Sequence, residues 1–135
     1  RRSGNASSIY QKTLLAMASV PLIEKEYNID SSRIYITGEG QTASRAALKY
    51  PEKFKGAIFI GNRLWEDNAE EKIKKALNNA FVFVTREVNV FPRGNRFGHR
   101  KFKTAGVKKL KLYFVRGSLR YDRLRFAESI EFLDG

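Results

Sequence analysis

Four short apolar segments recur along this chain, and segments of helical character separate them. Each is apolar at consecutive positions rather than at alternate ones, which is typical of strands buried on both faces of a parallel sheet. Strands that alternate with helices predict a three-layer α/β domain in which right-handed crossovers join about four parallel strands. The predicted strands are Arg33–Thr37, Gly56–Gly61, Ala80–Thr85 and Leu110–Val115.

Five helices are predicted around these strands from apolar periodicity, caps and breakers. In the first, Pro21 removes a backbone donor, so we expect a kink or a restart there with Ser19 as the cap. The second opens at Gln41 or Thr42, after a turn with glycine at positions 38 and 40, and Pro51 stops it. The predicted helices span residues 8–27, 41–50, 66–79, 95–104 and 124–133.

A chain of 135 residues with 42% apolar content fits one globular domain over residues 1–135, either whole or a fragment of a larger domain. The absence of cysteine excludes disulfides, thiolate metal sites and cysteine nucleophiles. No metal site and no cofactor is predicted. No apolar run is long enough for a membrane span, and the amino terminus lacks the apolar core of a secretory signal. The sequence leaves the compartment open.

Basic residues outnumber acidic ones by 26 to 14. Residues 69–135 hold sixteen basic and seven acidic side chains, against ten and seven in residues 1–68. We therefore expect an anionic partner, such as RNA or an acidic protein, to bind the carboxy-terminal half without sequence preference and with steep salt dependence. The anion-binding candidates are Arg93, Arg96, Arg100, Lys101, Lys103, Arg116, Arg120 and Arg123.

Part of this charge lies on the helix predicted at residues 95–104. Spacing of three and four residues places Arg93, Arg96 and Arg100 on one face, where they could contact several phosphates. The alternative is an ordinary amphipathic helix, with Phe97 and Phe102 on its buried side and the arginines on its solvated side.

The stretch Arg33–Tyr50 combines a buried strand, a glycine turn and a helix of small residues. With its surroundings, IDSSRIYITGEGQTASRAALKYPEKFKGAIFIG, it resembles the nucleophile-elbow region of α/β-hydrolase esterases, particularly the polyhydroxybutyrate-depolymerase and feruloyl-esterase-like branch. The resemblance continues through FVFVT, KTAGV, LKLYFV and AESIEFLDG. It covers nearly the whole chain but only the later half of that fold, and it implies a partial α/β-hydrolase-like domain.

The resemblance places the catalytic positions of the family on residues that cannot perform the reaction. The serine nucleophile falls on Gly40, which has no side chain, and the acid falls on Asn89, an uncharged amide. The histidine falls on Arg120, which stays protonated and cannot act as a base. The backbone N–H of Gln41 is the former oxyanion donor, and the second donor belongs to the absent half of the fold.

The resemblance therefore implies a pseudo-esterase that serves binding, assembly or structure. The alternative is a serine-hydrolase fragment whose catalysis has been removed or is completed by a missing amino-terminal half. We expect Thr42 and Ser44 to cap and pack, and Ser118 to lack a proton acceptor, because its neighbours are Arg116 and Arg120. We expect His99 to lie on the surface, so that Glu39 and Glu87 are the one remaining acid/base alternative.

The strand Arg33–Thr37 carries a further expectation. In the whole fold it pairs on its far side with a strand of the absent half, so in this chain it would be an exposed apolar edge, which natural proteins avoid. We expect the amino-terminal segment, a second copy of the chain in a homo-oligomer, or a partner chain to cover it.

Overall fold

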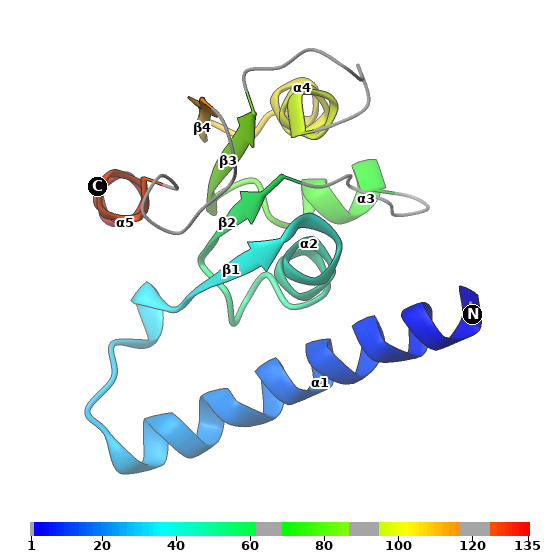
Figure 1. Ribbon diagram of the computed structural model, residues 1–135. Coiled ribbons are helices and arrows are strands. Elements are labelled where there is room, and N and C mark those ends of the chain that lie inside the picture. Colours follow the sequence, from blue (N-terminus) through cyan, green and yellow to red (C-terminus); the bar gives the residue numbers. More distant parts are fainter. Residues whose placement is uncertain (1, 62–68, 87–94, 117–124) are drawn as a thin grey trace.

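The computed structural model describes residues 2–61, 69–86, 95–116 and 125–135, with the backbone alone at residues 2–9, 39–41, 86 and 95–97 (Figure 1). The described chain alternates helices and strands, as the sequence predicts. The elements are α1 (Arg2–Glu26), the 3₁₀ turn η1 (Ser31–Arg33), β1 (Tyr35–Glu39), α2 (Gly40–Lys49), β2 (Gly56–Ile60), α3 (Ala69–Lys74), β3 (Ala80–Arg86), α4 (Asn95–Ala105), β4 (Lys109–Val115) and α5 (Phe126–Asp134).

The four strands form one parallel sheet in the order β1-β2-β3-β4. Tyr35 pairs with Gly56, Gly56 with Ala80, and Ala80 with Lys109, so the strands start at one level. Helices α2, α3 and α4 lie on one face of the sheet and α5 lies on the other, while α1 packs on the outside of α2 (Figure 1). The prediction of a three-layer α/β fold with four parallel strands is confirmed.

Aromatic side chains fill the space between the sheet and helices α2, α3 and α4. Phe59, Phe81 and Phe83 rise from β2 and β3 and surround Phe102 of α4, and all four are fully buried. The ring centroid of Phe102 lies 4.8 Å from that of Phe81 and 5.2 Å from that of Phe83, both edge to face, an arrangement that aromatic quadrupoles favour. The buried face predicted for this helix is therefore present.

Smaller aliphatic side chains pack the opposite face of the sheet under α5. Ile58, Val82 and Val84 lie there with Leu133 of α5. Gly56 admits this close packing, because a Cβ atom at its position would lie 2.6 Å from the Ala80 carbonyl oxygen and 3.0 Å from Leu133 Cδ2. The sheet, β1 and α5 thus converge on a position where only glycine fits without a shift of the backbone.

The prediction that Pro21 restarts the first helix with Ser19 as its cap is wrong. Helix α1 is continuous from Arg2 to Glu26, and the Ser19 hydroxyl donates to the carbonyl of Ala16 at 2.8 Å. Proline removes only one backbone hydrogen bond, and the neighbouring Val20 is buried in a cluster with Ala46 of α2. Tertiary packing holds the helix together across the proline.

Other boundaries also differ from their predicted positions. Strand β1 spans Tyr35–Glu39 instead of Arg33–Thr37, because Ser31–Arg33 form the turn η1. Helix α2 begins at Gly40, and Gly38 belongs to β1, where it pairs with Phe59 instead of forming a turn. Helix α3 is shorter than predicted, because hydrogen bonds of the i to i−3 type replace α-helical ones after Lys74. Helix α5 begins at Phe126.

Candidate functional site

The strand-to-helix junction predicted from the sequence is present. Glu39 is the last residue of β1 and Gly40 is the first residue of α2, so the chain reverses with no residue between the two elements. In a parallel sheet this junction lies at the carboxyl end of the strands, where ligands of α/β proteins bind. Gly40 offers no nucleophile at this point.

The other former triad positions, Asn89 and Arg120, lie outside the described residues, and so do Glu87 and Ser118. Of Glu39 and Gln41 only the backbone is described. The acid/base alternative therefore stays a prediction, because the structure does not set the separation of the two glutamates.

The hydroxyls after the junction differ in their surroundings. Ser44 is fully buried within the described chain, and Thr42 is half-buried. A buried hydroxyl on the inner face of α2 is closed to a substrate, so the expectation that Ser44 packs is confirmed.

His99 is half-buried, which corrects its expected place on the surface. Its ring lies edge-on to Phe83 with 5.9 Å between ring centroids. Burial, and then the positive charge of Lys103, lower the pKa of His99 below its ordinary value. A lowered pKa keeps the His99 ring neutral at neutral pH, and the ring packs against the edge of the aromatic core at Phe83. The sequence did not show this position, because His99 and Phe83 come together only in the tertiary structure.

The basic candidates divide into described and undescribed positions. Arg93, Arg120 and Arg123 lie outside the described residues, and only the backbone of Arg96 is described. The predicted stripe through Arg93 therefore remains untested. Lys101 is half-buried and takes part in an interaction.

One group of exposed cations lies around the last strand of the sheet. They project from α4, from the turn before β4, from β4 itself and from the residue after it. Residues 88–121, which include this region, contain no Asp or Glu. We call this group the basic rim: Arg100, Lys103, Lys108, Lys109, Lys111 and Arg116.

One lysine of the basic rim, Lys111, lies against an aromatic ring. Lys111 Nζ lies 5.6 Å from the ring centroid of Tyr113 on β4, and Arg125 Cζ lies 5.4 Å from the same centroid. Cations over an aromatic face are attracted by the quadrupole of the ring. The charge of β4 is thereby held on the α5 face of the sheet, with Arg100 and Lys103 on the α4 side.

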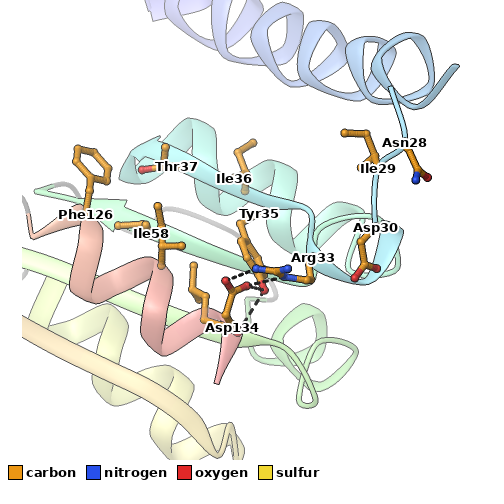
Figure 2. Close-up of a pocket in the computed structure, with 12 residues that line it drawn as sticks. Asn28, Ile29, Asp30, Arg33, Tyr35, Ile36, Thr37, Ile58, Phe126 and Asp134 are labelled. Atoms are coloured by element: carbon orange, nitrogen blue, oxygen red, sulfur yellow. Dashed lines mark hydrogen bonds and ion pairs between the residues drawn. The ribbon is translucent and has the colours of Figure 1, made fainter. Parts of the chain in front are cut away.

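An open apolar groove of about 600 Å³ lies at the opposite side of the molecule (Figure 2). Helix α5 forms one wall, β1 and β2 form the floor, and residues 28–30 form the far end. Its apolar lining consists of Ile29, Tyr35, Ile36, Ile58, Phe126, Ile130 and Leu133. Sequence analysis missed this groove because α5 and β1 are separated by nearly the whole chain.

A charged network closes one end of the groove (Figure 2). Asp134 accepts from Arg33 Nη2 at 2.6 Å and from Arg33 Nε at 3.1 Å, and the Tyr35 hydroxyl donates to it at 2.6 Å. The hydrogen bonds of Arg33, then that of Tyr35, hold the pKa of Asp134 below its ordinary value. Burial raises the pKa of Tyr35. The network joins the start of β1 to the end of α5.

The outer side of β1 has no strand beside it in the part of the chain that the structure describes. The Ile34 carbonyl accepts from Lys55 N–H at 2.8 Å, so the backbone groups of Ile34 and Ile36 face β2. Backbone groups alternate along a strand, so those of Tyr35 and Thr37 point away from the sheet. Helix α1 packs in one cluster with Ile34 and Ile36 and does not pair with the strand, so the amino-terminal segment, one of the three covers we expected, contributes side-chain packing and no added strand.

The described residues hold no cluster of histidine and acidic side chains that could bind a metal ion. None of their helices is long and apolar enough to cross a membrane. Comparison of the chain with protein-family models, with curated proteins and with solved structures finds no match.

Proposed function

We propose that this chain is a non-catalytic, α/β-hydrolase-like binding module that holds an anionic partner through its basic rim. The observation that carries the proposal is the concentration of exposed cations on α4 and β4, inside a stretch from 88 to 121 that has no acidic residue. A surface rich in one sign of charge attracts a polyanion.

The absence of catalysis rests on the junction between β1 and α2. A serine hydrolase needs a nucleophile there, and Gly40 has none. It also needs a second oxyanion donor from a loop of an earlier strand, and β1 is the first and outermost strand of the described sheet. Both features support a function without catalysis.

RNA or an acidic protein fits the basic rim by charge alone. Lys108, Lys109 and Lys111 lie within four positions of one another, and Arg100 and Lys103 lie on the helix that packs against the same strand. Lysines on an extended strand and cations on a helix contact a charged backbone without reading a base pattern. We expect binding that is independent of sequence.

The test is the salt dependence of binding to single-stranded RNA. Replacing Lys103, Lys109 and Lys111 by Gln should reduce the slope of log K against log salt by about two to three, since each lost phosphate contact removes about 0.7 to 0.9. The matched control replaces three exposed lysines elsewhere, Lys25, Lys74 and Lys75, by Gln. Equal losses in both variants, or binding that salt does not weaken, would overturn the proposed function.

The second candidate is a serine-hydrolase fragment, which the shape of the β1 to α2 junction favours. Hydrolysis of p-nitrophenyl acetate by the unmodified chain and by Gly40→Ser separates the two functions. We expect background rates from both, because Gly40→Ser supplies a hydroxyl with no base assigned to it. A rate above background in the unmodified chain contradicts the non-catalytic function.

The proposal also includes a partner at the β1 edge. The outward-facing backbone groups of Tyr35 and Thr37 lie beside the apolar groove and pair with no strand in the described chain, so an extended segment of a partner chain or of a second copy could add a strand and fill the groove at once.

A further inference from the structure

Helix α1 presents apolar side chains on two opposite sides. Its inner side packs against α2, with Thr13 and Val20 buried. Its outer side faces away from the sheet at the border of the molecule (Figure 1). Leu15 and Leu22 on that side are 71% and 67% exposed. Large apolar side chains exposed together on one side of a helix mark a candidate contact surface for a partner.

Some of the exposed apolar residues of α1 form an ordered stripe, whereas Tyr10 and Ile23 lie outside it. Leu15, Ala18 and Leu22 follow one another at spacings of three and four residues, which brings them to one face of the helix. Leu14 lies at the border of this face and is also exposed. We call these four residues the α1 stripe. Its spacing is that of a seam between two helices.

We infer that the α1 stripe is the contact surface between two copies of this chain, with the two α1 helices antiparallel. The residues beside the α1 stripe favour a second copy of the chain over other partners. Lys12, Ser19 and Glu26 are spaced by seven residues along one flank, with the cation at the amino-terminal end and the anion at the carboxy-terminal end. Both charged side chains are exposed.

A two-fold axis near Ser19 makes these charges complementary. In the antiparallel pair, Lys12 of each copy lies beside Glu26 of the second copy, and this ion pair occurs twice. The same register places Leu15 beside Leu22 of the second copy, with Ala18 at the crossing point, where a small side chain permits close approach. A parallel pair would place Lys12 beside Lys12 and Glu26 beside Glu26, which repel.

The size of the stripe sets the expected strength of the dimer. One pair of helices that meet over about three turns buries less than the roughly 1,600 Å² of a standard interface. We therefore expect a reversible dimer with a dissociation constant on the order of 10 µM, in equilibrium with monomer. The interface leaves the basic rim free, because the rim lies at the other end of the sheet, so the inference does not rest on the proposed function.

The test is sedimentation velocity over a concentration series up to about 100 µM, at which a 10 µM dimer is largely formed. Leu15→Glu with Leu22→Glu should weaken the dimer at least tenfold. The matched control is Ala127→Glu, which introduces a glutamate at an exposed apolar residue of α5 that does not line the groove, and it should leave the dimer intact. An unmodified chain that stays monomeric overturns the inference, and so does a dimer that only Ala127→Glu disrupts.

Charge reversal separates direct contact from damage to the helix. Lys12→Glu and Glu26→Lys should each weaken the dimer on the order of threefold, and the double variant should restore it, because the ion pairs are re-formed with opposite sign. Ala18→Cys gives a second readout in this cysteine-free chain. It should form a disulfide-linked dimer on mild oxidation, whereas Glu52→Cys, at an exposed position away from the stripe, should not. Failure of both the rescue and the Ala18→Cys cross-link overturns the antiparallel arrangement.

Discussion

The two edges of the sheet are built differently. The β4 edge carries Lys109 and Lys111, both exposed, whereas the described side chains of β1 at the other edge carry no charge. Lysines on an edge strand oppose pairing with another chain, because an added strand would bury them. The lysines therefore protect β4 against strand addition, and the described side chains of β1 provide no such protection.

Each edge strand carries a tyrosine on the α5 face of the sheet, and the two tyrosines have different partners. Tyr35 of β1 donates to Asp134, which Arg33 also holds, so an acidic group anchors this edge. Tyr113 of β4 lies instead beneath Lys111 and Arg125. The two tyrosines lie in different register rows, since Tyr35 shares its row with Lys109 and Tyr113 shares its row with Glu39. The α5 face of the sheet thus has carboxylate hydrogen bonding at the β1 edge and cation–π contact at the β4 edge.

The largest expected effect comes from proline on the two sides of β1. Ile36→Pro should lower the free energy of unfolding by about 3 kcal/mol or more, because it removes a donor that faces β2 and part of a packed side chain. Thr37→Pro removes a donor that faces away from the sheet and should cost about 1 kcal/mol or less. Urea unfolding followed by circular dichroism measures both.

The same pair of variants tests the open edge. If a partner strand pairs with β1, Thr37→Pro abolishes its binding although the domain stays folded. Equal destabilisation by the two prolines would show that β1 does not have one inner and one outer side.

Gly56→Ala should be the next most damaging change. The added Cβ would lie 2.6 Å from the Ala80 carbonyl oxygen and 3.2 Å from Tyr35 Cδ1, so β1 and α5 must move apart. We expect a loss of about 2 kcal/mol in the free energy of unfolding. Lys109→Ala, at the other edge in the same register row, should change it by less than about 0.5 kcal/mol. Similar losses for both would contradict the close packing at Gly56.

Removing the charges of β4 should convert it into an open edge. Lys109→Thr with Lys111→Thr should leave the free energy of unfolding within about 0.5 kcal/mol and raise self-association, since threonine favours strands and carries no charge. Static light scattering at increasing protein concentration measures the change. The control is Lys74→Thr with Lys75→Thr, which removes the same charge elsewhere and should scatter like the unmodified chain. Equal scattering from all three proteins would show that β4 is protected by something other than its lysines.

The sequence predicts the strands better than the site, and particular residues show why. Consecutive apolar residues such as those of Ala80–Arg86 identify a buried strand locally, and the parallel sheet follows from the alternation with helices. The continuity of α1 through Pro21 could not be predicted, because packing of Val20 on α2 opposes the local signal. The groove could not be predicted either, since Asp134 meets Arg33 from 101 residues away.

The network at Asp134 gives the smallest expected effect and the one that depends on pH. Its hydrogen bonds hold the pKa of Asp134 in the folded chain below its value in the unfolded chain. A lowered folded pKa stabilises the fold above the unfolded pKa of about 3.9, and this contribution is lost as the pH falls through the folded value. Asp134→Asn should therefore melt at a slightly lower temperature than the unmodified chain at pH 7.

This difference in melting temperature should shrink as the pH is lowered below about 4, where the carboxylate of the unmodified chain becomes protonated as well. Glu131→Gln, an exposed acid on the same helix, is the control and should show no comparable deficit at pH 7. A deficit of Asp134→Asn that is the same at pH 7 and at pH 3 would mean that the charge of Asp134 does not hold α5 to the open β1 edge. The network would then be a neutral contact, and the contrast with the cationic β4 edge would reduce to the lysines alone.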